Sequence, residues 1–565
     1  MDSALPIEAP LVIKDPEGAQ WDLDCGLLVV GLGAAGASAA IHAKEAGADV
    51  LVLDRFGMGG ATAKSGGVVY AGGGTAVQRK LGVEDSPEAM FNYLRLETGD
   101  AVGEDTLRRF CNDSRGLIEW LESIGASFDS NDEPPKTSYP KNGIYLYYSG
   151  NEAVLPFAEA APPAPRGHRT ADAGLSGKRL FTHLNNRVAA LGIPVHSQCA
   201  VRQLITDNNG NVIGVRAWRL TPGSEAARKH EKLIRRADTI HNGLPGMADR
   251  LRAKASAIEQ AEAQPLNIRA RQGVVLTTGG FIFNREMVAQ YAPNYRHNMR
   301  LGTTGCEGSG IRLGQSVGGA IGRMHKASAW RFINPPQVWV KGMVVDGQGK
   351  RFCNEASYGA RLGVQMCDEH DGKAWLIMDA GIRRAAIREA LFGGLWIFQK
   401  GPALLLMLFA RRARSIVSLA HKLGLPAETL NAELHAYNRV AEEGGTDALG
   451  KTADKMQVLN NPPYYALNIS AVDNPMFPCP TITLGGLKID ETSGAVVNEA
   501  GESIPGLYAA GRAAIGIASN GYVSGLSLAD CLWSGKRAGL AAIQPATGAT
   551  VTELPTSAAA NQAVN

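Results

Sequence analysis

Apolar runs that end in glycine-rich turns recur along the chain and predict an α/β fold. A short apolar strand at 26–30 leads into the turn GLGAAG, and an alanine-rich helix runs from there to about Ala46. A second apolar strand, 49–53, ends at Asp54. A strand, glycine turn, helix and strand with an acid at that position are typical of a dinucleotide-binding βαβ unit. The pattern therefore predicts a Rossmann-like domain with a pyrophosphate at the helix N-terminus.

Two more strands with glycine-rich ends return to this unit much later in the sequence. The segment 273–281 ends in Thr278, Gly279 and Gly280, and the segment 507–510 ends in Gly511. The second strand is followed by a loop and an apolar-periodic helix, for which Ser524 or Ser527 is the expected N-cap. We expect this loop and the first glycine turn, Gly31–Gly36, to hold the two ends of one long ligand, and a flavin dinucleotide has that shape.

A second glycine cluster, 57–74, follows the βαβ unit and contains Thr62 and Ser65. Such a density of glycine predicts a backbone cradle along a flavin, which a nicotinamide enzyme does not need. This segment contains no histidine, so we expect FAD to be bound non-covalently. The residues expected to bind it are Gly31, Gly33, Ala34, Ala35, Gly36, Asp54, Arg55, Gly60, Ala61, Thr62, Ser65, Gly66, Gly67, Val201, Thr278, Gly279, Gly280, Gly511, Arg512, Gly525, Ser527 and Leu528.

The length of 565 residues exceeds what one hydrophobic core supports and predicts two domains. We expect an FAD-binding domain made of 1–281 and 475–545, an inserted α+β cap (catalytic) domain at 282–474, and a disordered tail at 546–565. Two amphipathic helices are expected within 85–126. A helical insertion at about 222–268 carries charges of alternating sign, which are typical of a solvated face.

Net charge and cysteine usage narrow the classes of partner. A net charge of +3 gives no reason to expect nucleic acid, and the eight cysteines are scattered without a CxxC pair. Reduced, buried thiols in a cytoplasmic protein are expected, with no metal site. The N-terminal segment has neither a basic nor an apolar region of a signal peptide.

The stretch 391–410 is almost continuously apolar and has arginines on both sides. Lys400 and Pro402 fall near its middle, which argues against a membrane-spanning helix. Two interpretations stay open. The stretch is either a peripheral anchor at the inner face of the membrane or an apolar face that packs inside the cap.

Five motifs occur together in one order: GLGAAG, SGG, VVLTTGG, GKRFCNE and GLYAAG. In these the chain resembles the fumarate reductase and succinate dehydrogenase flavoprotein superfamily over nearly its full length. The dicarboxylate enzymes of that superfamily bind substrate with an arginine and a histidine, where this chain has Tyr522 and Thr483. Because two carboxylates need fixed cations, fumarate or succinate is not the expected substrate.

The loop GYVSG and the tract NEASYGAR resemble the 3-ketosteroid dehydrogenases, in particular the Δ4-(5α) branch. The resemblance implies desaturation between C4 and C5 of a 3-ketosteroid. Tyr522 would polarise the C3 ketone, Ser524 would take the C4 proton, Tyr358 would activate Ser524, and the C5 hydride would pass to the flavin. The plainer interpretation makes Tyr522 a packed aromatic residue and Ser524 a helix cap.

Other interpretations remain open at the level of the sequence. They are a Δ1-dehydrogenase, a reductase of a small unsaturated acid that would use Arg361 or Arg512, and a non-catalytic flavoprotein. The electron acceptor, a quinone or an electron-transfer protein, is not indicated by any motif. His168 is more often a structural donor than a base in such a loop. Some aromatic residues are candidates for the substrate pocket or for core packing: Trp330, Phe332, Tyr464 and Tyr465.

Overall fold

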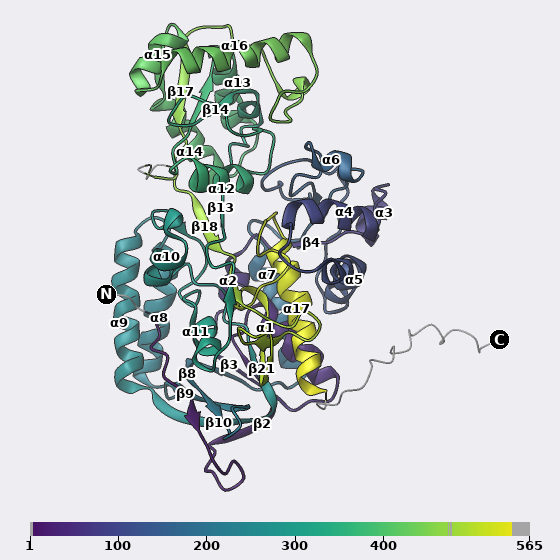
Figure 1. The fold of residues 1–565 in the computed structure, drawn as a ribbon, viewed down its shortest axis with the longest axis vertical. Helices are drawn as coiled ribbons and strands as arrows, with labels where there is room; N and C mark the ends of the chain where they lie inside the picture. The colour runs from purple at the N-terminus through teal and green to yellow at the C-terminus, as the bar shows by residue number, and fades with distance from the viewer. Residues whose placement is uncertain (1–3, 473, 475–476, 545–565) are drawn as a thin grey trace, which may run out of the picture.

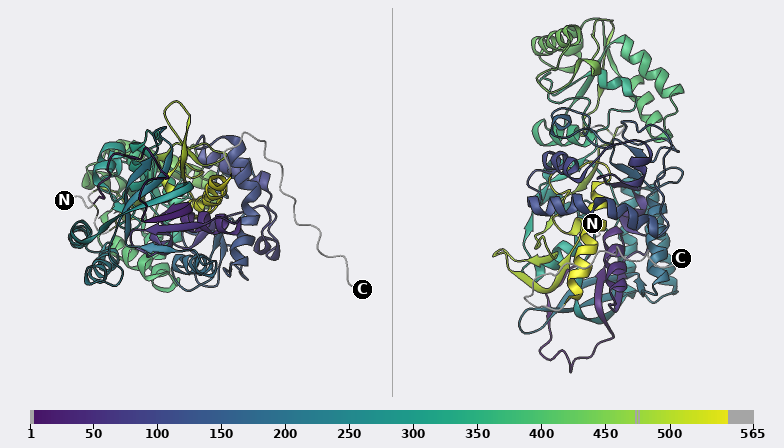
Figure 2. Two further views of the ribbon diagram at one scale, coloured as in Figure 1. Left: turned by 90° about the horizontal axis from the view of Figure 1, so that it is seen from below. Right: turned by 90° about the vertical axis from the view of Figure 1, so that its right-hand side faces the viewer.

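The structure is a computed structural model that describes residues 4–472, 474 and 477–544. The tail predicted at 546–565 lies outside these residues. The described chain forms two lobes stacked along its long axis (Figure 1), and the side view in Figure 2 shows the same arrangement. The lower lobe carries the large sheet, and the upper lobe carries a smaller sheet covered by helices.

Five neighbouring parallel strands form the centre of the large sheet. Their order across the sheet is β7 (Val195–Ser197), β3 (Val50–Asp54), β2 (Leu23–Val30), β10 (Gln264–Leu276) and β21 (Ser503–Ala509). The stretches of β2, β3 and β10 that pair with one another there are mostly apolar. Helices α1 (Ala34–Glu45) and α17 (Leu526–Ile543) pack closely against each other. A Cβ at position 535 would overlap the backbone of Ala35, so the glycine there allows the close approach. The first and last segments of the described chain therefore share one core.

Antiparallel strands extend this sheet. The first half of β10 pairs with β9 (Val212–Arg219), which pairs with β8 (Cys199–Thr206), while β20 (Ala495–Val497) pairs with β21. The short β1 (Leu11–Val12) pairs with β8 in parallel. The predicted Rossmann-like α/β fold is confirmed.

The insertion consists of α8 (Glu225–Ile240) and α9 (Pro245–Glu262), as predicted, but its charged residues are not all solvated. Arg252 and Glu259 of α9 are buried, and His230 of α8 donates or accepts a hydrogen bond at 2.9 Å to Glu259. Arg55 from the end of β3 binds the same carboxylate at 2.8 Å. The expectation of a solvated face was wrong for this side, because α9 packs on α8 and its buried Glu259 needs the cationic and hydrogen-bonding partners Arg55 and His230.

A smaller group of elements lies beside α17 in the lower lobe. Helices α4 (Pro87–Thr98) and α5 (Glu104–Ser123) confirm the two helices predicted within 85–126. The other elements are α2 (Gly60–Lys64), β4 (Val68–Tyr70), α3 (Ala76–Lys80), β5 (Leu146–Tyr147), α6 (Phe157–Ala160), β6 (Gly167–Arg169) and α7 (Gly177–Ala190). His168 lies in β6, where its ring nitrogens contact the Thr75 hydroxyl at 2.8 Å and the Arg166 carbonyl at 3.0 Å. Burial lowers its pKa to about 4, and both contacts are structural.

The upper lobe has its own sheet and its own apolar core. The sheet order is β14 (Met343–Val345), β15 (Trp375–Met378), β17 (Tyr464–Asn468) and β16 (Arg411–Ala413), all antiparallel. Its helices are α12 (Gly359–Glu369), α13 (Ala380–Phe392), α14 (Ile397–Leu408), α15 (Ile416–Leu423) and α16 (Ala427–Glu443). This lobe falls within the predicted cap, although the exact domain boundaries stay a prediction.

Short strands and helices connect the two lobes. Strand β18 (Pro480–Thr483) lies between β11 (Met299–Arg300) and β13 (Ala327–Ala329), and β12 (Ile321–Gly322) pairs with β19 (Gly486–Leu487). Helices α10 (Arg285–Tyr291) and α11 (Ser309–Ser316) belong to the lower side of this region. Among the described residues, we find no helix with the length and apolar character needed to cross a bilayer.

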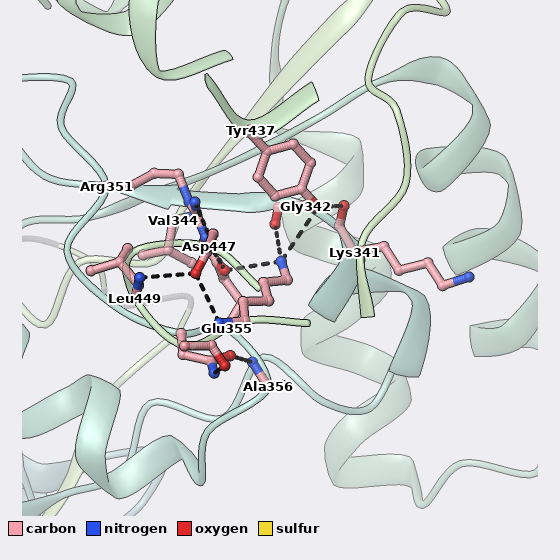
Figure 3. A network of polar contacts seen from close by, with 12 residues as sticks. Lys341, Gly342, Val344, Arg351, Glu355, Ala356, Tyr437, Asp447 and Leu449 are labelled. Carbon is pink, nitrogen blue, oxygen red and sulfur yellow. Dashed lines mark hydrogen bonds and ion pairs between the residues drawn. The ribbon is translucent and has the colours of Figure 1, made fainter. Parts of the chain in front are cut away.

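A buried ionic network anchors the loop that precedes α12 (Figure 3). The Glu355 carboxylate binds Arg351 at 2.8 Å and Lys451 at 2.9 Å, and Arg351 also binds Asp447 at 2.8 Å. Burial opposes ionisation, but Lys451 and Arg351 outweigh it and hold the pKa of Glu355 at about 2. The network therefore fixes the chain three residues before Tyr358.

Candidate active site

A cleft at the carboxyl ends of β2, β3 and β10 is the candidate cofactor site. Ligands of open parallel sheets bind at this edge, because helix N-termini and loop amides converge there. Many of the residues predicted to bind FAD line it: Gly31, Gly33, Ala34, Ala35, Asp54, Arg55, Gly60, Ala61, Thr62, Val201, Thr278, Gly279 and Arg512. Their contacts with FAD stay a prediction.

The glycines of the first turn have different physical roles. Gly31 has φ +103°, and a Cβ there would lie 2.8 Å from the Thr277 carbonyl oxygen. A Cβ at Gly36 would overlap the Gly31 carbonyl oxygen. A Cβ at Gly33, by contrast, would meet only the Thr62 hydroxyl at 3.4 Å. Gly31 and Gly36 therefore allow the backbone to pack, whereas Gly33 leaves the N-terminus of α1 open to a ligand.

The acid at the end of β3 organises its own loop. One Asp54 carboxylate oxygen accepts the Leu32 N–H at 2.7 Å, and the other accepts the Phe56 N–H at 2.9 Å. The Thr62 hydroxyl accepts the Ala34 N–H in the first turn of α1 at 2.9 Å. Asp54 and Thr62 thus hold the turn and the cradle together at the edge of the cleft.

Two buried guanidinium groups reach the cleft with unused donors. Within the described part of the chain, Nη1 of Arg55 and Nη1 of Arg512 are buried and have no hydrogen-bond partner, although Arg55 Nη1 forms an ion pair with Glu307 at 3.4 Å. The Arg512 Nη2 lies 3.5 Å from the Cys306 sulfur. Because buried donors are normally satisfied, these atoms call for acceptor oxygens in the cleft. Phosphate and ring carbonyl oxygens of FAD are such acceptors, so the cleft fits the cofactor.

The remaining predicted cofactor residues lie outside the lining of this cleft: Gly36, Ser65, Gly66, Gly67, Gly280, Gly511, Gly525, Ser527 and Leu528. Some of them shape the neighbouring backbone; the Ser65 hydroxyl, for example, donates to the Thr62 carbonyl at 2.8 Å. Asp238 of α8 lines the cleft but was not predicted, because its helix was assigned to solvent. One of its oxygens is buried without a hydrogen-bond partner.

Ser524 lies between two buried phenols. Its Oγ is 3.2 Å from the Tyr147 hydroxyl. Tyr358 is its second phenol neighbour, because the Ser524 side chain opposes part of the rise that burial causes in the pKa of Tyr358. Ser524 and Tyr358 are therefore neighbours, and their roles stay a prediction. Tyr147 was missed, because the sequence gives only an aromatic-rich loop at this point and not the strand β5.

The three phenols of this site are neutral at physiological pH. Burial raises the pKa of Tyr147 and that of Tyr358 well above the ordinary value of 10. Burial also raises the pKa of Tyr522 to about 12, although the nearby Arg512 cation opposes this shift. Each phenol is thus a hydrogen-bond donor at neutral pH.

Backbone contacts fix the position of Ser524. Its N–H donates to the Ser149 carbonyl at 3.2 Å, and the Ser149 hydroxyl donates to the Ser524 carbonyl at 3.0 Å. The N-cap of α17 is Gly525, with φ +94°, and not Ser524 or Ser527 as expected. A side chain at residue 525 would come within 2.8 Å of the Tyr70 nitrogen, so glycine is required there and the Ser524 hydroxyl is free of capping.

An aromatic wall adjoins the hydroxyl cluster. The Trp330 ring stacks on Tyr522 at 5.7 Å between centroids, and Phe332 contacts Tyr358 edge to face at 5.3 Å. Trp330 and Phe332 are therefore at the site, as one of their two interpretations predicted. Tyr464 and Tyr465 are elsewhere, in β17, where they pack against the core of the upper lobe.

The chain matches the family model described as FAD binding domain over residues 26–525. It is 41% identical to the 3-oxo-5-alpha-steroid 4-dehydrogenase of Comamonas testosteroni over 90% of this chain and 96% of that protein. A 3-oxosteroid 1-dehydrogenase of Mycobacterium tuberculosis is 27% identical over 88% of this chain and 94% of its own length.

A solved structure is similar throughout. The 3-ketosteroid-delta4-(5alpha)-dehydrogenase from Rhodococcus jostii, solved with 4-androstene-3,17-dione, superposes with a TM-score of 0.79 at 30% identity. The alignment covers 95% of this chain and 100% of that one. Together with the cofactor cleft, these similarities show that the chain belongs to the FAD-binding flavoprotein family that includes the 3-oxo-5α-steroid 4-dehydrogenase.

Proposed function

We propose that this protein is an FAD-dependent 3-oxo-5α-steroid 4-dehydrogenase, which introduces a double bond between C4 and C5 of a 3-ketosteroid. The observation that carries the proposal is the position of Ser524 between the phenols of Tyr147 and Tyr358, beside Tyr522. The 41% identical relative bears the name of this activity.

Tyr522 is proposed to polarise the substrate ketone. The C4–H bond is next to the C3 ketone, so a hydrogen bond to the carbonyl oxygen stabilises the enolate that forms when the proton leaves. Tyr522 is a neutral donor because burial raises its pKa to about 12, although the Gly525 backbone, by hydrogen bonding to it, opposes part of this rise. The stacked Trp330 limits the orientations of the Tyr522 ring.

Ser524 is proposed to take the C4 proton. An alcohol is a weak base, so Ser524 must give up its own proton as it accepts the one from C4. The Tyr358 hydroxyl receives that proton and passes its own toward solvent. Tyr147 holds the Ser524 oxygen from the other side and is proposed as a positioning residue.

Bound FAD supplies the redox chemistry by accepting the hydride that leaves C5. Arg512 and the open N-terminus of α1 would hold the cofactor in the cleft. The physiological electron acceptor is proposed to be a quinone or an electron-transfer protein.

The competing functions differ in observable ways. A Δ1-dehydrogenase would place the double bond between C1 and C2. A reductase of a small acid needs cations at the substrate, but Arg361 is exposed and lies over the Phe157 ring, and Arg512 lines the cofactor cleft. A non-catalytic flavoprotein would bind FAD that no steroid reduces.

Anaerobic titration of the purified holoenzyme with a 5α-androstane-3-one-type steroid tests the proposal. We expect the flavin absorbance to bleach and product analysis to find the C4–C5 double bond. Ser524→Ala, Tyr522→Phe and Tyr358→Phe should each reduce steroid-dependent dye reduction about a hundredfold or more while FAD stays bound. Reoxidation of chemically reduced enzyme by fumarate-type acids and not by steroid enones, or a C1–C2 double bond in the product, would refute the assignment.

A further inference from the structure

The surface around α14 exposes large apolar side chains. Phe392 is 82% exposed, Ile397 is 86% exposed and Leu408 is 70% exposed. We call the exposed apolar residues between α13 and β16 the 391–409 patch, and its members are Leu391, Phe392, Ile397, Leu405, Leu408 and Phe409. Isolated apolar residues on a surface are ordinary, but a contiguous group in one segment marks an interaction site.

Helix α14 has one side buried in the upper lobe and the other side exposed. Its Ala403, Leu406 and Met407 are buried in the core of that lobe, while Leu405 and Leu408 face outward. The interpretation that the 391–410 stretch packs inside the cap therefore holds for one side of the helix, while the other side is exposed and the peripheral anchor stays a prediction. The exposed side belongs to a helix whose position is fixed by its buried side.

The 391–409 patch has a strongly basic border. Between residues 383 and 414 the basic residues are Arg383, Arg384, Arg388, Lys400, Arg411, Arg412 and Arg414, against one acidic residue. That acid, Glu389, is used internally, because its carboxylate accepts the Gln337 N–H at 2.7 Å. Apolar side chains surrounded by cations complement a surface that is apolar beneath a layer of negative charge.

The same segment reaches the active-site region through its first residues. The Trp396 ring contacts the Tyr139 ring edge to face at 6.4 Å, and its Nε1–H donates to the Pro140 carbonyl at 3.4 Å. The Tyr139 hydroxyl donates to the Gly66 carbonyl at 3.0 Å, in the predicted flavin cradle. Trp396, which lies within the same segment as the patch, therefore contacts the loop that leads into β5 and Tyr147.

We propose that the 391–409 patch docks the protein onto the surface of a bilayer that contains anionic lipid. The apolar side chains enter the interface while the arginines bind lipid phosphates, and no segment crosses the membrane. The docking would also let an apolar steroid pass from the bilayer to the active site without crossing water. This last point rests on the proposed function.

Vesicle flotation of the full-length holoenzyme tests the proposal without any steroid. We expect binding to vesicles that mix phosphatidylglycerol with phosphatidylcholine, and much weaker binding to phosphatidylcholine alone. Neutralising single arginines, as in Arg388→Gln or Arg411→Gln, should lower binding to the mixed vesicles about fivefold each. High salt should weaken binding in the same way.

The triple variant Phe392→Ser, Ile397→Ser, Leu408→Ser should lose vesicle binding but keep dye-coupled turnover in solution. The control Leu175→Ser, Leu244→Ser removes two large apolar side chains that are exposed outside the patch, and it should bind like the parent protein. Binding retained by the triple variant would overturn the proposal. The proposal would also be overturned if the parent protein does not bind vesicles but self-associates through the patch in sedimentation experiments. Because binding is measured without steroid, failure of the proposed enzyme activity leaves this test intact.

Discussion

Tyr147→Phe separates the roles of the two phenols that flank Ser524. The substitution removes one hydroxyl and keeps the buried ring, so β5 and its packing should persist. Ser524 would retain Tyr358 as its other phenol neighbour. The reasoning above assigns proton transfer to Tyr358 and positioning to Tyr147, and therefore predicts unequal losses.

The expected magnitude follows from the contact. A neutral hydrogen bond of 3.2 Å contributes about 0.5–1.5 kcal/mol net. Since about 1.4 kcal/mol corresponds to a tenfold change in rate, Tyr147→Phe should slow the chemical step between about twofold and tenfold. Tyr358→Phe removes the acceptor of the Ser524 proton and should slow it about a hundredfold or more.

The assay is anaerobic stopped-flow reduction of the enzyme-bound flavin by saturating 5α-3-ketosteroid, which reports the chemical step without the electron acceptor. Tyr464→Phe is the matched control, because Tyr464 lies in β17 away from Ser524, and its rate should equal that of the parent. A loss of a hundredfold or more in Tyr147→Phe, with a near-normal rate in Tyr358→Phe, would refute the assignment and exchange the two roles.

Three further predictions concern stability and cofactor binding. Lys451→Met leaves the buried Glu355 carboxylate with one cation fewer and should lower the free energy of unfolding by about 3 kcal/mol, measured by denaturant titration. Glu355 and Glu259 each have a pKa of about 2 in the folded state, below the ordinary 4.5. Because the unfolded chain then binds more protons, the free energy of unfolding should fall as the pH drops from 4.5 toward 2. A melting temperature that does not change over that interval would contradict this. Gly36→Ala should abolish FAD absorbance in the purified protein, whereas Gly116→Ala, which meets nothing within 4 Å, should keep it.

The sequence was sufficient for the fold and for much of the site where the signal is local. Glycines between apolar runs identify the cofactor-binding turn, because few other side chains fit positions such as Gly31 and Gly36. The resemblance to the steroid dehydrogenases then predicted Tyr358 and Ser524 in one site, and the two residues are neighbours in the structure.

What escaped prediction depends on partners that are far apart in the chain. Tyr147 lies 377 positions from Ser524, and nothing local distinguishes it from its aromatic neighbours. The sequence pattern predicted Glu259 to be exposed, but in the structure it is buried with Arg55 and His230 as partners. The cap of α17 was misassigned because a serine side chain is the commoner solution, whereas close packing on Tyr70 demands glycine at 525.

The pairing of Ser524 with Ser149 joins segments 375 positions apart, and α17 follows directly. During synthesis, Ser524 can meet Ser149 and Tyr147 only after residue 524 has been made, long after the first cofactor turn. The proposed proton-transfer cluster therefore assembles only once the segment that leads into α17 has emerged.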